Sequence, residues 1–221
     1  MYIIMLGGPG SGKGSVGGRV SEDFNLPHIA TGDIFRAELK SETELGKKIK
    51  KYMDNGLLVP DEVVIETVES RLSQEDVKNG AILDGFPRTK DQAIALDKFL
   101  AEKGKKVDAA IELDVSDEDI VKRIVKRVIC SNKSCGESYN TEFKPSKEEG
   151  ICDKCGSTLI KRADDNEETV MQRLKVYHDT SKELLEYYKD TGVLYTVHPN
   201  IYSKTVLEDS VSEVETYLKN K

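Results

Sequence analysis

A glycine-rich run near the start of the chain has the composition of a phosphate-binding loop. The run GGPGSGKGS extends from Gly7 to Ser15, directly after an apolar segment and before a helical pattern. Glycines let backbone N–H groups turn inward around phosphate oxygens without Cβ clashes, and the N-terminus of the next helix adds partial positive charge. Lys13 supplies a mobile cation for the β- and γ-phosphates. A merely flexible turn is the alternative, and the order of strand, loop, lysine and helix disfavours it.

A second chemical group follows the apolar run 81–83. Asp84 ends that run, which places its carboxylate at the carboxyl edge of the sheet, where open α/β sheets bind ligands. Gly85 and Pro87 predict a sharp loop that aims Arg88 at phosphate. Gln92 lies four residues further on, and its amide can donate to and accept from a base edge. The alternative for Gln92 is an ordinary solvated helix residue.

Four more arginines could complete a phosphoryl-transfer site. Arg123 and Arg127 are four residues apart, so we expect them to share one face at the end of a helix. Arg162 and Arg173 flank an acidic pair, Asp164–Asp165. Each arginine alone is more often a surface residue, and the first two could simply complement a helix C-terminus. Phosphoryl transfer, however, needs charge stabilisation and positioning more than covalent chemistry, and guanidinium groups suit that task.

Four cysteines are confined to a short segment with metal-ligand spacing. Cys130 and Cys135 are separated by four residues, and Cys152 and Cys155 by two. Two such knuckles, joined by a hairpin-length stretch, can close a tetrahedron of thiolates around Zn²⁺ and leave no open coordination position. The metal would then be structural. Two disulfides or four free thiols are the alternatives, and the first knuckle is wider than the commonest spacing.

Short apolar runs alternate with amphipathic stretches along the chain, which predicts an α/β fold with a parallel sheet flanked by helices. Ser116 can cap a helix to about Arg127, and a long helix is expected over about 166–189. Residues 37–73 read as consecutive helices, 130–161 as a loop- or strand-rich insert, and 210–221 as a closing helix. The strands are expected at Tyr2–Leu6, Pro27–Ala30, Ala81–Leu83, Ala109–Leu113 and Val193–Thr196.

The composition excludes several classes of protein. The net charge of −7 argues against a protein that coats nucleic acid or an anionic membrane. The sequence has no apolar run near the ~20 residues that span a bilayer, and Met1–Leu6 is too short for a signal peptide. We therefore expect a cytoplasmic protein. One tight cysteine cluster in such a chain favours metal over disulfides.

The glycine-rich run, with the pattern Gly-x-Pro-Gly-x-Gly-Lys-Gly followed by Ser15, resembles the adenylate kinases. The resemblance extends to Thr31-Gly32-Asp33-Ile34-Phe35-Arg36 and to Asp84-Gly85-Phe86-Pro87-Arg88, and it covers almost the whole chain. It implies a P-loop core (1–30, 61–127 and 162–221), a helical monophosphate-binding insert (31–60, "the insert") and a zinc-ribbon-like lid (128–161, "the lid"). The long lid bearing four cysteines is similar to that of the long-form members.

The resemblance also implies a role for each matching residue. The catalytic set is Lys13, Asp84, Arg88, Arg123, Arg127, Arg162 and Arg173, with Asp84 positioning Mg²⁺ and with Asp164 and Asp165 locking the closed lid. ATP would contact Gly10, Ser11, Gly12, Lys13, Gly14, Ser15, Arg127, Ser138 and Tyr139. AMP would contact Thr31, Arg36, Leu57, Leu58, Val59, Gly85, Phe86, Pro87, Arg88, Gln92, Arg162 and Arg173. Structural Zn²⁺ would bind Cys130, Cys135, Cys152 and Cys155. For Tyr139, ordinary hairpin packing is an equal alternative.

The implied reaction is reversible phosphoryl transfer from Mg·ATP to AMP, giving two ADP. GTP as donor, or UMP or CMP as acceptor, are alternatives within the class, and the run His198–Ile201 departs from the usual pattern where the donor base would lie. A non-catalytic zinc-ribbon protein that binds nucleotide is the alternative from another class. The expected partners are ATP, AMP and ADP, with no nucleic acid or membrane, and we expect a monomer.

Overall fold

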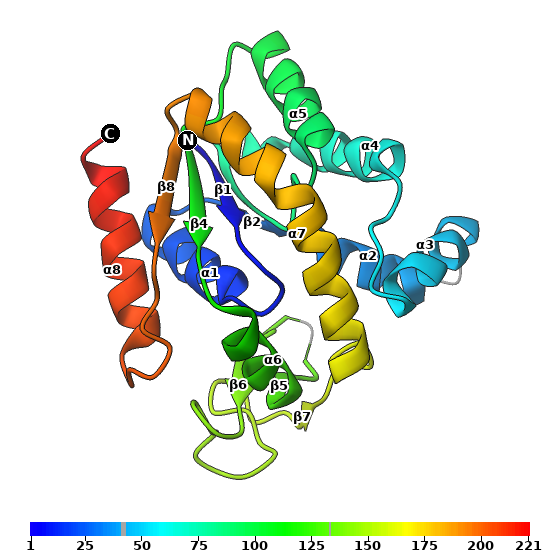
Figure 1. The fold of residues 1–221 in the computed structure, drawn as a ribbon, viewed down its shortest axis with the longest axis vertical. Coiled ribbons are helices and arrows are strands. Elements are labelled where there is room, and N and C mark those ends of the chain that lie inside the picture. Colours follow the sequence, from blue (N-terminus) through cyan, green and yellow to red (C-terminus); the bar gives the residue numbers. More distant parts are fainter. Residues whose placement is uncertain (41–42, 133) are drawn as a thin grey trace.

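A five-stranded parallel sheet forms the centre of the molecule (Figure 1). The computed structural model describes residues 1–40, 43–132 and 134–221; positions 41–42 of the insert and 133 of the lid lie outside the described residues. Neighbouring strands run in the order β2-β3-β1-β4-β8. Their bounds are β1 Tyr2–Leu6, β2 His28–Ala30, β3 Ala81–Asp84, β4 Ala109–Leu113 and β8 Leu194–Val197. All five expected strands are confirmed, with ends that differ by one residue at most.

The sheet is buried on both faces, which explains its nearly continuous apolar strands. In β1, Ile4 and Leu6 belong to one hydrophobic cluster, and Ile3 and Met5 belong to another. Side chains along a strand point alternately to opposite faces, so the two clusters are the two layers of the core. A polar residue at any of these positions would lose its water without gaining a partner.

Helices cover both faces. On one face, α1 (Lys13–Phe24) and α8 (Val206–Lys219) pack on each other and on the sheet. On the other lie α4 (Asp61–Leu72), α5 (Lys90–Glu102) and α7 (Glu167–Asp190). Side-chain caps define where α5 and α7 begin. The Thr89 hydroxyl accepts from the Gln92 N–H at 3.2 Å, and Asn166 Oδ1 accepts from the Thr169 N–H at 2.9 Å. The long helix expected over 166–189 is confirmed.

The insert leaves the sheet after β2 as consecutive helices, as expected. It contains α2 (Thr31–Lys40) and α3 (Glu44–Asp54), and α4 follows it; the short 3₁₀ helix η1 (Glu75–Val77) precedes β3. Thr43 caps α3 by accepting from the Gly46 N–H at 2.9 Å. In Figure 1 α2 and α3 lie to the side of the sheet, away from α1 and α8.

The lid follows α6 (Asp117–Val125) and contains a small antiparallel sheet of order β6-β5-β7. Its strands are β5 Arg127–Cys130, β6 Ser138–Asn140 and β7 Leu159–Ile160. The expectation that one helix continues to Arg127 is wrong. Val128 and Ile129 pair with Tyr139 and Ser138 of β6, so the helical spacing gives way to strand pairing. Arg127 therefore lies on a strand and shares no helix face with Arg123.

Every helix in the described part of the chain is too short or too polar to cross a membrane.

Candidate nucleotide site

The glycine-rich loop joins the end of β1 to the start of α1, with its glycines packed against the β4–α6 region. A Cβ at Gly7 would lie 2.5 Å from the Leu113 carbonyl oxygen, and one at Gly10 would lie 2.3 Å from Ile124 Cγ1. Both residues also have positive φ, at 130° and 77°. Neither position therefore accepts a side chain. The loop adopts a shape that only glycine permits, with the N-terminus of α1 facing it.

Lys13 lies inside this loop. Its Nζ donates to the carbonyl oxygens of Gly7 at 2.9 Å and Gly8 at 2.8 Å. Burial lowers the pKa of Lys13 to about 8; the nearby Asp84 carboxylate opposes this shift, and Arg88, Arg127 and Arg173 add to it. The buried Ser11 hydroxyl has no hydrogen-bond partner among the described residues. Both groups can turn to an incoming phosphate.

Asp84 is placed beside the loop by strand register. It pairs with Met5 across β1 and β3, so its carboxylate lies at the carboxyl edge of the sheet as predicted. A Cβ at Gly14 would lie 3.1 Å from Asp84 Oδ2. A side chain at this position, where the general motif has Ser or Thr, would therefore crowd the Asp84 carboxylate. The carboxylate lies near the loop, which suits a Mg²⁺ that is bound by one or two carboxylates, waters and phosphates.

The loop after β3 is tied to the start of the insert. The Thr31 hydroxyl donates to the Gly85 carbonyl oxygen at 2.8 Å, and Arg88 Nε donates to the same oxygen at 2.8 Å. Thr31 is buried, while Arg88 is exposed. These contacts hold the Arg88 side chain against the loop after β3, beside the start of the insert.

The predicted arginines gather around the same region. Arg123 Nη1 donates to the Ser11 carbonyl oxygen at 3.4 Å, and Arg127 forms an ion pair with Asp165 at 2.5 Å. Arg173 pairs with Asp164, and Asp33 Oδ1 lies 2.5 Å from Arg36 and 3.9 Å from Arg162.

Electrostatics shows that these cations are crowded. Burial, reinforced by Arg36 and Arg127, lowers the pKa of Arg162 to about 10, and Asp33 and Asp165 only partly oppose it. Arg162 Nε is buried without a hydrogen-bond partner in the described part of the chain. An unpaired donor among mutually repelling cations is a site where an anion would bind favourably.

The candidate base-binding residues have different environments. Leu57 is exposed, Leu58 is half-buried and Val59 is buried. Gln92 is 1% exposed, and its amide already contacts the Arg88 N–H and Asp61. Asp61 was not among the predicted site residues, and its position two residues after Val59 was the only signal for it.

Of the two predicted nucleotide contacts in the lid, Tyr139 is packed inside. Its ring is 5% exposed, and its hydroxyl accepts from the Asp153 N–H at 2.8 Å and lies 3.5 Å from Cys152 Sγ. Ser138, its neighbour on β6, is half-buried. The packing alternative describes Tyr139 in this structure, and contact of either residue with nucleotide stays a prediction.

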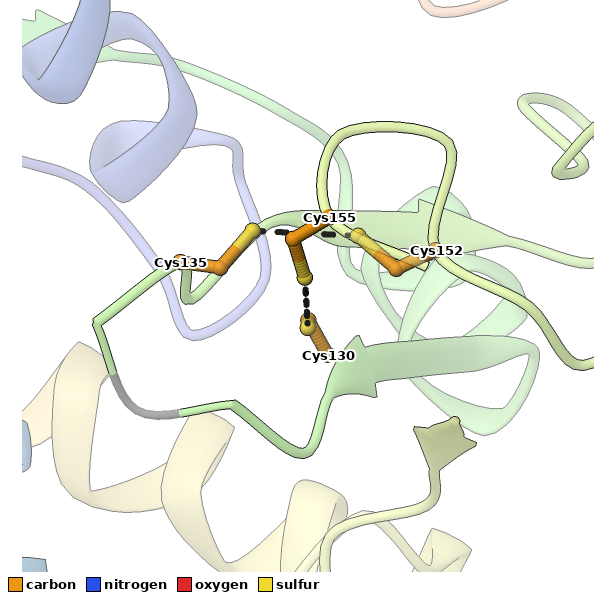
Figure 2. Close-up of side chains that lie close together, drawn as sticks. All are labelled: Cys130, Cys135, Cys152 and Cys155. Carbon is orange, nitrogen blue, oxygen red and sulfur yellow. Dashed lines mark hydrogen bonds between the residues drawn. The ribbon is translucent and has the colours of Figure 1, made fainter. Parts of the chain in front are cut away.

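The four cysteines point their sulfur atoms toward one another (Figure 2). All four Sγ atoms lie within 4.8 Å of one another, with 3.4 Å between Cys130 and Cys155 and 3.7 Å between Cys135 and Cys152. Tetrahedral Zn²⁺ with Zn–S bonds of about 2.3 Å separates its sulfurs by roughly 3.8 Å. The cysteines are free thiols, and hydrogen bonds with Ser157 lower the pKa of Cys155 to about 6. The cluster therefore fits a metal site with four thiolate ligands.

The fold and the cation cluster define a P-loop protein that binds nucleotide phosphates. Residues 5–193 match the sequence profile of the family described as adenylate kinase, and the chain therefore belongs to that family. Curated relatives with the name adenylate kinase are similar over most of their lengths. The relative from Caldicellulosiruptor saccharolyticus is 55% identical over 196 residues, 89% of this chain and 90% of the relative. The one from Caldicellulosiruptor bescii is 51% identical and the one from Clostridium acetobutylicum 50%, with at least 95% of each chain covered.

Proposed function

We propose that this chain transfers the γ-phosphoryl group of ATP reversibly to AMP, giving two ADP. The observation that carries this proposal is the clustering of Lys13 with six arginines around the phosphate loop, in a member of the adenylate kinase family. Phosphoryl transfer spreads negative charge over the transferred group, and such a cluster stabilises that charge. The acceptor already carries a charged phosphate, so the reaction needs no strong general base.

In the forward reaction an oxygen of the AMP phosphate attacks the γ-phosphorus of ATP. The bond between that phosphorus and its bridging oxygen to the β-phosphate breaks, and the β-phosphate retains the electron pair. Lys13 and the loop N–H groups hold the donor phosphates, while Arg88 and Arg36 hold the acceptor. Arg123, Arg127, Arg162 and Arg173 contact the transferred group. The family pattern and the contacts described above support these roles.

Mg²⁺ would be held near Asp84, where it neutralises charge on the donor phosphates. Asp84 meets the requirement for a carboxylate beside the phosphate loop, since a Cβ at Gly14 would lie 3.1 Å from its Oδ2. Zn²⁺ would be held by Cys130, Cys135, Cys152 and Cys155, and it would stabilise the lid without taking part in the reaction.

Several finer assignments complete the proposal. The core, which is made of three chain segments, would act as one unit, and the insert 31–60 and the lid 128–161 as two others. The lid would close over ATP to exclude water. Asp164 and Asp165 would hold the closed lid through Arg173 and Arg127. The protein would act as a cytoplasmic monomer, with ATP as the preferred donor.

The test is ADP formation from ATP, AMP and Mg²⁺ by the wild-type protein and two arginine variants. We expect Arg88→Met to lower kcat/KM by about a hundredfold, since one well-placed charge contact contributes that order of magnitude. Arg71→Met is the control, because Arg71 lies in the last turn of α4 and pairs with Asp76 of η1. Absence of ADP formation by the wild-type protein would refute the proposed phosphoryl transfer. Replacing ATP by GTP, and AMP by UMP or CMP, tests the donor and acceptor bases.

A further inference from the structure

Two hydrogen bonds fix the orientation of the Gln92 amide. The Arg88 backbone N–H donates to Gln92 Oε1 at 2.7 Å, and Gln92 Nε2 donates to Asp61 Oδ1 at 2.7 Å. A backbone N–H can only donate, and a carboxylate can only accept. A flipped amide would set its NH₂ group against the Arg88 N–H and its oxygen against the Asp61 carboxylate. The two partners therefore permit one orientation.

Asp61 is itself held in place. Its second oxygen, Oδ2, accepts from the Thr89 hydroxyl at 2.8 Å. The Thr89 oxygen also accepts from the Gln92 N–H at 3.2 Å and so caps α5. These contacts form a ring through Asp61, Thr89 and Gln92, closed by the Gln92 backbone N–H, that joins the first turn of α4 to the first turn of α5. Asp61 cannot rotate away from Gln92 without breaking the bond to Thr89.

Burial makes the orientation costly to change. Gln92 is 1% exposed, so water does not replace a hydrogen bond that a flip would break. A buried polar atom that faces a like partner bears the full cost of its lost hydration. Each amide atom nevertheless uses only one of its two hydrogen-bonding positions in these contacts. The oxygen keeps a lone pair and the nitrogen keeps a proton for a further partner.

We propose that Asp61 is a positioning residue that sets the specificity for the acceptor base. The proposal rests on the proposed function and on the contact between Gln92 and the base of AMP that the family resemblance implies. Adenine presents an amino donor beside a ring-nitrogen acceptor, which matches an amide whose oxygen and nitrogen have a fixed order. Hypoxanthine has a carbonyl acceptor in place of the amino group. Its pairing requires the flipped amide, which Asp61 opposes.

The experiment compares AMP with IMP as acceptor, with ATP as donor, in wild-type protein, Asp61→Asn and Glu62→Gln. The side chain of Asn can donate as well as accept, so Asp61→Asn tolerates both orientations of Gln92 at that contact. We expect the ratio of kcat/KM for IMP to that for AMP to rise about tenfold, the usual weight of one buried mismatched hydrogen bond. Glu62→Gln removes the same charge from the same helix turn at an exposed position, and it should leave the ratio unchanged.

A merely structural role for Asp61 would reduce the activity on both acceptors by one factor. An unchanged ratio in Asp61→Asn, or an equal rise in Glu62→Gln, overturns the proposal. Asp61→Ala provides a second test if Asp61→Asn folds poorly, because it also removes the opposing carboxylate and should raise the ratio. Failure of the wild-type protein to phosphorylate AMP would refute the proposed function instead, which is a different result from an active enzyme with an unchanged ratio.

Discussion

Arg127 and Asp165 form a two-point ion pair across the base of the lid. Arg127 Nε lies 2.8 Å from Asp165 Oδ2, and Nη2 lies 2.5 Å from Oδ1. The Asp165 side chain has no exposed surface, and that of Arg127 is 20% exposed. One residue precedes the lid and the other follows it, so this pair joins the two chain segments that enter and leave the lid. A planar guanidinium fits a carboxylate in this way, and a lysine would not.

We expect Asp165→Asn to destabilise the protein by about 3 kcal/mol, because it leaves Arg127 largely buried with no carboxylate partner. Urea unfolding of the wild-type protein and the variant measures this difference. The matched control is Asp76→Asn, which breaks another two-point pair, Arg71 with Asp76, at an exposed position. Exposed pairs contribute little, so the control should unfold at nearly the wild-type midpoint. Equal effects of the two variants would contradict a special role for the buried pair.

Much of this arrangement could be predicted from local sequence. The strands are apolar on both faces, and the helices begin at residues such as Ser116 and Asn166 whose side chains accept from the first turn. Asp84 could be placed because it ends an apolar run, and the carboxyl end of a strand lies at the ligand-binding edge of an open α/β sheet. The four cysteines could be grouped because ligand spacing is itself a local signal.

Contacts between distant segments could not be predicted in this way. Arg127 continues the helical spacing of α6, but pairing of β5 with β6 takes it into a strand. The bond between Asp61 and Gln92 joins residues 31 apart, and no periodicity indicates it. Tyr139 matches a nucleotide contact by sequence position, yet the lid packs its ring beside Cys152. In each case, the deciding partner is far away in the chain.

The buried Tyr188 hydroxyl provides a stability prediction. Tyr188 has no exposed surface, and its oxygen has no hydrogen-bond partner among the described residues. Burial raises the pKa of its hydroxyl. We expect Tyr188→Phe to be neutral or to stabilise the protein by about 1 kcal/mol, because it removes an unsatisfied buried polar atom.

Tyr2 is the matched control for that variant. It is also buried, but its hydroxyl donates to the Val77 carbonyl oxygen at 3.0 Å. Tyr2→Phe should therefore lower the free energy of unfolding by about 1 kcal/mol. Thermal unfolding of the two variants under one condition gives both values, and a lower midpoint for Tyr188→Phe than for Tyr2→Phe would show that Tyr188 has a partner.

The cysteine cluster predicts about one Zn²⁺ per chain in protein purified without added zinc, since four thiolates close one tetrahedral site. Cys152→Ser should lower that content to near zero and lower the unfolding midpoint, because metal binding contributes to the stability of the lid. Ser134→Ala, an exposed change beside Cys135, should retain the metal. Metal analysis and calorimetry measure both effects. Four reactive thiols and no metal in the wild-type protein would contradict the assignment.

The low pKa of Lys13 predicts a specific pH dependence of ATP binding. In the free protein, burial holds this pKa at about 8. Bound phosphates favour the charged ammonium, so the pKa in the complex is higher, and binding takes up a proton between the two values. ATP affinity should therefore fall as pH rises through the pKa of the free protein.

Between about pH 7.5 and about pH 9, the dissociation constant should rise by roughly an order of magnitude, because Lys13 must then gain a proton to bind. Titration calorimetry in two buffers of different ionisation enthalpy measures the proton uptake directly. Lys13→Met is the control, since it should bind ATP weakly with no uptake assignable to this residue. A wild-type affinity that stays constant over this interval would show that Lys13 is already charged throughout, and an equal slope in Lys13→Met would assign the titration to another group.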